Sequence, residues 1–158
     1  MQGARKILGV ICCAVGLVGC SGTYTTAPDQ ESADGMARQA LEQLCSFEPQ
    51  DLAAGTVINR IRDFVHPELW SAISADPSLV VPEVSTETRE QWERHGGTTA
   101  VAVAVSGEQH PPDTAHSWNR KMDCTRFWPG FSEPFVDVYA VTATEEDGVW
   151  KIQSLWLI

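Results

Sequence analysis

The first half of the chain carries hydrophobic residues at the spacing of amphipathic helices. Three- and four-residue intervals recur in a segment that Asp34 can cap and Pro49 ends, and again from residue 58 to 65. Pro67 opens a short third helix, and a fourth is predicted at 87–94, before a pair of glycines. The hydrophobic positions of the first three are Met36, Ala40, Leu41, Leu44, Cys45, Ile58, Ile61, Phe64, Val65, Leu69, Trp70 and Ile73.

In the second half of the chain, the character of the side chain changes at every other residue, which is the pattern of a β-strand with two different faces. Residues 98–105 place valines on one face and alanines on the other, and we expect the small alanine face to pack closely under a helix. Strands at 135–144 and 149–158 follow, joined by Glu146-Asp147-Gly148, a strong hairpin signal. One further strand has these residues on one face: Trp118, Arg120, Met122 and Cys124.

Helices followed by four sequential strands predict an α+β domain over residues 34–158, with helices packed on one face of an antiparallel meander. The order of elements and the closing sequence 147–152 (DGVWKI) resemble the NTF2-like superfamily, whose domains form a cone with a curved sheet. Within it, small exported actinobacterial proteins and conjugation- or Mce-associated domains are the most similar. The superfamily contains enzymes, binders and scaffolds, so the resemblance alone implies no activity.

The N-terminus has the layout of an export signal. Arg5 and Lys6 precede an apolar run, 7–18, which is too short to span a membrane, since that takes roughly 20 residues. The run ends in 17–20 (LVGC), which resembles the lipobox of bacterial lipoproteins. That resemblance implies a signal peptide at 1–19, acyl chains on Cys20 and a lipid-anchored, extracytoplasmic protein. An ordinary signal peptide that happens to precede a cysteine is the alternative.

The polar residues 20–33 are predicted to form a flexible tether between this anchor and the domain. Removal of residues 1–19 takes away Arg5 and Lys6, so the net charge changes from −10 to −12. A strongly acidic chain lacks the clustered basic face that nucleic acids and anionic headgroups require. We therefore expect no nucleic-acid partner, and membrane association through the acyl chains alone.

Two cysteines, Cys45 and Cys124, remain after Cys20, and they are 79 residues apart. In an exported protein two such thiols are expected to form a disulfide. Two buried free thiols are the alternative. The chain has no Cys-x-x-Cys motif, so nothing favours a redox function.

Few residues point to chemistry. Asp137 and Tyr139 lie on one face of a predicted strand, and inside a cone they could act as a base and an oxyanion donor. The alternative is that Asp137 faces water and Tyr139 packs against a neighbour. Residues 110–116 contain two histidines and an aspartate, ligand types that suit zinc, but a solvated hairpin loop explains them equally well. His66 and His95 lie at predicted helix ends, and we expect no catalytic residue, cofactor or metal ion.

The segment 127–131 (FWPGF) combines a Pro-Gly turn with three large rings. If the turn is exposed, Trp128 and Phe131 form a partner contact; if it folds back, they close the open end of the cone. The sequence therefore predicts a non-enzymatic binding or scaffolding module of the cell envelope, with a transport or conjugation-type assembly as partner. A small-molecule enzyme or a lipid or ligand carrier that uses the cone cavity is the alternative.

Overall fold

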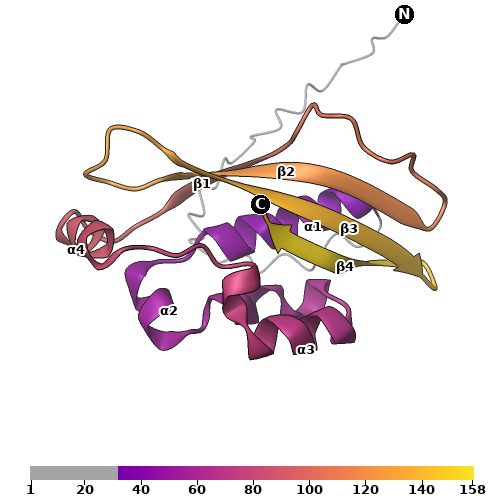
Figure 1. Cartoon of the computed structure of the whole chain (residues 1–158), viewed down its shortest axis with the longest axis horizontal. Helices are drawn as coiled ribbons and strands as arrows, with labels where there is room; N and C mark the ends of the chain where they lie inside the picture. The colour runs from indigo at the N-terminus through magenta and orange to yellow at the C-terminus, as the bar shows by residue number, and fades with distance from the viewer. Residues whose placement is uncertain (1–31) are drawn as a thin grey trace, which may run out of the picture.

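The computed structural model describes residues 32–158, in which six helical segments precede four strands (Figure 1). The helical segments are α1 (Ala33–Cys45), α2 (Pro49–Ala54), η1 (Val57–Phe64), α3 (Pro67–Ala75), η2 (Pro77–Leu79) and α4 (Thr86–Arg94). The strands are β1 (Ala100–Val105), β2 (Ser117–Phe127), β3 (Phe135–Glu146) and β4 (Val149–Leu157). Cys20, the signal peptide at 1–19 and residues 20–31 of the tether lie outside the described residues.

The four strands form one antiparallel sheet in the order β1-β2-β3-β4, so the predicted α+β class and meander are confirmed. The β3–β4 hairpin closes where expected: Glu146 pairs with Val149, and Asp147 and Gly148 have φ values of 55° and 81°. Two successive positive φ values match the twist of a two-residue hairpin. The register shifts between Thr142 and Ala143, and such a bulge bends a strand.

Helix α1 lies along one side of the sheet and contacts all four strands, which cross in front of it in Figure 1. Met36, Leu41 and Leu44 are fully buried on its sheet-facing side. Its N-cap is Ser32, whose hydroxyl accepts a 3.1 Å hydrogen bond from the Gly35 N–H. The prediction of Asp34 as the cap is therefore wrong.

Two helical predictions also change in detail. The sequence predicts that Pro49 ends the first helix, but α1 already ends at Cys45, and Pro49 is the first residue of α2. The predicted second helix is a 3-10 helix, η1, ending before Val65, which forms a parallel bridge with Ile152 of β4. Its β-branched residues Val57, Ile58 and Ile61 disfavour a regular α-helix.

The sheet has an inner face, covered by the helices, and an outer face, against which no helix of residues 32–158 packs. On β1, Val103 is buried on the inner face, whereas the alanines at 100, 102 and 104 are exposed. The expectation that the alanine face packs under a helix is wrong, because the larger valines bury more apolar area against α1. Within residues 32–158, no helix has the length and apolar character needed to span a membrane.

Candidate functional site

The sulfur atoms of Cys45 and Cys124 are 2.11 Å apart, which is disulfide distance. Cys45 is the last residue of α1, and Cys124 lies on the inner face of β2. Both residues are fully buried. A bond here links the helical layer to the sheet at the middle of the core.

The aromatic turn between β2 and β3 folds back onto the domain. Only 4% of Trp128 is exposed, and its ring stacks on Trp92 of α4 with centroids 4.3 Å apart and an angle of 15°. Phe47 meets the same ring edge-on at 6.2 Å, and the half-buried Phe131 also packs edge-on at 6.2 Å. The exposed-turn reading of Trp128 as a partner contact is therefore wrong, because its ring is enclosed by other rings.

Gly130 has a structural requirement at the tip of this turn. Its φ is 88°, and a Cβ atom there would lie 2.4 Å from His95 Nδ1. Gln91 Nε2 donates a 2.7 Å hydrogen bond to the Gly130 carbonyl. Helix α4 and the turn therefore form one packed unit, and His95 belongs to the helix end, where the sequence placed it.

Arg126 lies under this aromatic cluster and is only 2% exposed. Its Nη2 donates to Asp137 Oδ2 on the neighbouring strand. Its guanidinium also lies over the rings of Phe47, at 5.0 Å, and Trp128, at 5.5 Å. Burial lowers the pKa of Arg126 from its usual value, and the nearby Tyr139 opposes that shift.

A cleft of about 270 Å³ opens beside Arg126. Residues 82–85 and Thr88 form one side, and Arg126, Trp128, Phe135 and Asp137 form the sheet side. Among residues 32–158, three buried nitrogens of the sheet side have no hydrogen-bond partner: Arg126 Nε, Arg126 Nη1 and Trp128 Nε1. These three nitrogens are enclosed by protein atoms and are not open to the cleft.

Asp137 and Tyr139 do lie on one face of β3, as predicted, but each is already engaged. The Tyr139 hydroxyl donates a 2.9 Å hydrogen bond to the Val80 carbonyl, and burial raises the pKa of Tyr139. Asp137, with 21% of its side chain exposed, pairs with Arg126. Sequence reasoning missed Arg126, although the inward stripe from Trp118 to Cys124 continues to it.

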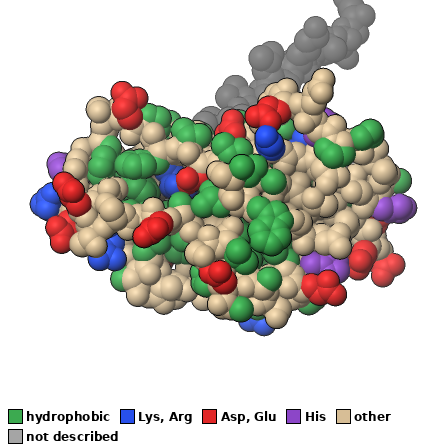
Figure 2. Space-filling view, viewed as in Figure 1, with side chains coloured by type: hydrophobic (Ala, Val, Ile, Leu, Met, Phe, Trp, Pro, Cys, Tyr) green, Lys and Arg blue, Asp and Glu red, His purple; other side chains and the backbone are tan. Residues whose placement is uncertain are grey.

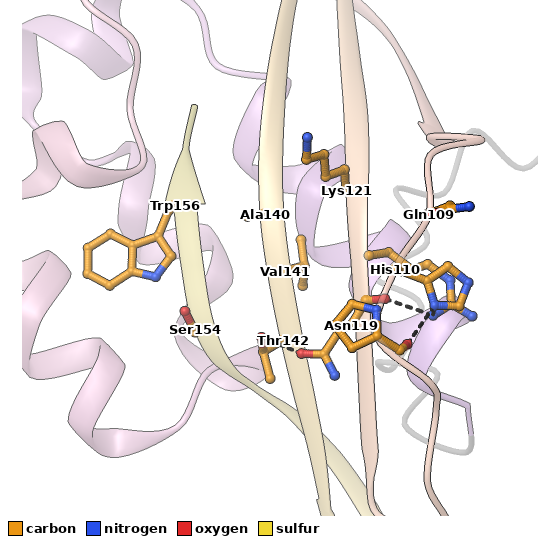
Figure 3. A pocket seen from close by; sticks show the side chains of 11 residues that line it. Gln109, His110, Asn119, Lys121, Ala140, Val141, Thr142, Ser154 and Trp156 are labelled. Atoms are coloured by element: carbon orange, nitrogen blue, oxygen red, sulfur yellow. Dashed lines mark hydrogen bonds between the residues drawn. The ribbon is translucent and has the colours of Figure 1, made fainter.

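The outer face of the sheet is the second candidate surface. The exposed large hydrophobic residues of the described chain are Phe127, Val136, Trp156 and Ile158, and strand alternation places all of them on this face. Figure 2 looks onto this side and shows hydrophobic side chains spread between acidic ones. A groove of about 240 Å³ runs over its centre, from Trp156 of β4 across Thr142 and Asn119 to His110 (Figure 3).

The loop that borders this groove does not gather metal ligands. Arg120 pairs with both oxygens of Asp113 at 2.6 Å and donates to His110 Nδ1 at 2.8 Å, and the Arg120 hydrogen bond lowers the pKa of Asp113. His116 instead pairs with Glu145 of β3. No group of three or more His, Cys, Asp or Glu side chains able to hold a metal ion occurs within residues 32–158. The solvated-loop reading fits this geometry.

Comparisons of the chain with protein-family models, with curated proteins and with solved structures gave no significant match.

Proposed function

We propose that this protein is a lipid-anchored, extracytoplasmic binding module of the cell envelope with no catalytic activity of its own. The anchor is Cys20, and residues 20–31 tether it to a domain of NTF2-like type that begins at the cap of α1. The LVGC sequence at 17–20 supports the anchor, and helices on one face of a four-stranded antiparallel sheet suit the NTF2-like type. The engagement of Asp137 by Arg126 and of Tyr139 by Val80 favours binding over acid–base chemistry.

The observation that carries the binding role is the outer face of the sheet. Phe127, Val136 and Trp156 are about half exposed and lie on neighbouring strands of that face. Apolar side chains gathered on one face of a soluble domain are typical of a protein-contact surface. Polar residues of the groove, such as Asn119 and Thr142, lie beyond Trp156 on the same face and can fix the orientation of a partner.

Charge identifies the kind of partner that suits this face. The chain from Cys20 onward has 21 Asp and Glu and a net charge of −12, because only Arg5 and Lys6 are lost from the total of −10. Such a charge repels a second copy and an anionic lipid surface alike. The occupant is therefore a different envelope protein, with an apolar patch flanked by Lys and Arg.

The anchor is tested by mass spectrometry of the protein isolated from the cells that produce it, together with detergent partitioning. We expect a diacylglyceryl-modified N-terminal Cys20 that follows the detergent phase, and a Cys20→Ala variant that does not. An unmodified Met1, or identical partitioning of both proteins, contradicts the anchor.

The docking face is tested by in-cell crosslinking from a photoreactive residue at Val136, with the exposed Glu90 of α4 as the control position. We expect one discrete adduct, formed from position 136 only, and its partner should be a basic protein. The yield of this adduct should fall in high salt. An adduct of twice the subunit mass would indicate a second copy, and equal labelling from both positions would indicate no specific face. Either result overturns the proposed partner.

A further inference from the structure

We infer that the groove on the outer face of the sheet binds an uncharged oligosaccharide, with one pyranose ring on the indole of Trp156 and the next over Thr142 and Asn119. The groove has a volume of about 240 Å³ and crosses β4, β3 and β2 (Figure 3). This site goes beyond the proposed protein contact. Val136, where that contact is tested, lies six positions before Thr142 on β3, which is about 20 Å at the rise of a strand.

Trp156 provides a flat apolar surface at one end of the groove. It is 48% exposed, and Figure 3 shows the face of its indole ring turned toward the viewer. Its partner on the neighbouring strand is Ala140, which also lines the groove, and so small a side chain leaves the floor open beside the ring. A pyranose ring suits this surface, because one of its faces carries C–H groups that pack on an aromatic face.

A row of uncharged polar side chains continues the groove beyond the indole ring. Asn119 of β2, Thr142 of β3 and Ser154 of β4 are cross-strand neighbours, and all three line the groove. The Thr142 hydroxyl donates a 2.8 Å hydrogen bond to Asn119 Oδ1, so its oxygen can still accept one. Asn119 Nδ2 gives one of its two hydrogens to Ser117 and keeps the other. Side chains that both donate and accept match sugar hydroxyls, which do the same.

The charges around the groove favour a ligand without charge. Its Arg and Lys side chains are already paired: Arg120 with both oxygens of Asp113, and Lys121 Nζ with Glu108 Oε2 at 2.5 Å. Within residues 32–158, no Asp or Glu lines the groove, so it offers a cation no carboxylate. An anion would be repelled by the acidic chain as a whole. A ligand that has many hydroxyl groups and no charge meets neither obstacle.

The width of the groove sets the shortest ligand. From β2 to β4 it crosses two strand spacings, about 10 Å in all. Two linked pyranose rings have this length, so a disaccharide is the shortest sugar that reaches both Trp156 and Asn119. Cellobiose and N,N′-diacetylchitobiose are uncharged disaccharides of this shape, and the second adds acetamido groups that can meet the Asn119 amide. These two sugars are therefore the probes.

The test is a titration of the full ¹⁵N-labelled chain, held in a detergent that has no sugar headgroup. Binding is followed by the Trp156 indole N–H and the Ala140 backbone amide resonances. A saturable shift of both signals with either probe supports the inference, and no saturable shift with both probes overturns it. Digalacturonate, which carries two carboxylates, should bind at least about tenfold more weakly than the better probe. Equal binding of digalacturonate also overturns the inference.

Two threonines of β3 provide a matched pair of variants. Thr142 and Thr144 lie on the same face by strand alternation, but only Thr142 lines this groove. We expect Thr142→Val to weaken binding about fivefold, the effect of one lost hydrogen bond, and Thr144→Val to leave it unchanged. Trp156→Ala, followed by the Ala140 amide, should weaken binding more than Thr142→Val does. Equal binding by the two threonine variants, or wild-type binding by Trp156→Ala, contradicts the inference. The titration contains no second protein, so its result is independent of the crosslinking from Val136.

Discussion

The inner and outer faces of the sheet are made from the same strands but differ in what they contribute. On β1 the inner Val103 is buried while the outer Ala102 is exposed, and on β4 the inner Leu155 is fully buried beside a Trp156 that is 48% exposed. The inner face holds α1, the cysteine pair and Arg126. Buried and exposed positions thus alternate residue by residue, and paired substitutions on the two faces should differ in their effect on stability.

The largest contrast is expected between two tryptophans. Trp92 is fully buried between Phe47 and Trp128, so Trp92→Ala should lower the free energy of unfolding by about 3–5 kcal/mol. Trp156→Ala on the outer face should cost under about 1 kcal/mol. Urea unfolding of both variants measures the difference. Equal losses would mean that the outer face is as tightly packed as the inner one.

The cysteine pair should give the next largest effect. Oxidation of Cys45 and Cys124 closes a loop of 79 residues, which stabilises a fold by roughly 4 kcal/mol on the chain-entropy model. We expect the Cys45→Ala/Cys124→Ala variant, or reduction of the wild type, to lose stability of that order. If reduction leaves the melting temperature unchanged, the two thiols are not joined in the native protein.

Tyr139 provides a smaller effect with a defined pH dependence. Tyr139→Phe leaves the buried Val80 carbonyl without its donor, at a cost of about 1–3 kcal/mol near neutral pH. Burial raises the folded-state pKa above 10.0, so the wild-type stabilisation is complete below pH 10 and is lost as pH rises through the raised pKa. Unfolding at several alkaline pH values should therefore show a shallower decline for Tyr139→Phe, and parallel declines would contradict this assignment.

The smallest contrast is expected on β1. Val103→Ala removes two buried methyl groups and should cost about 1–2 kcal/mol. Ala102→Val adds a β-branched side chain on the exposed face and should change stability by less than about 0.5 kcal/mol. The melting temperatures of the two variants compare the two faces at adjacent positions. A lower melting temperature for Ala102→Val would mean that other residues cover the alanines.

The sequence predicted the fold class well because local periodicity determines it. Alternation around Val103 and the Asp147-Gly148 turn located strands and a hairpin without knowledge of the rest of the molecule. Periodicity does not say which face of a two-sided strand is covered, so the alanines of β1 were assigned wrongly. It also does not distinguish a 3-10 helix from an α-helix over the short segment 57–64.

The Arg126 cleft depends on contacts that are distant in sequence. Arg126 pairs with Asp137 of the neighbouring strand β3, and the rings of Phe47 and Trp128 cover its guanidinium. Phe47 is 79 residues away from Arg126, so no local pattern connects them. Asp137 could be proposed from its strand, but its partner could be found only once the strands were paired.

The position of the cysteine pair also determines how this domain would respond to tension. In the oxidised protein, a force applied at Ser32 could straighten α1 only as far as Cys45, and would then pass directly into β2 through Cys124. The 78 residues between them, from 46 to 123, would be shielded from the load. The segment from Phe64 to β1, with the wall of the cleft at 82–85, would therefore keep its length while the chain on its N-terminal side was stretched.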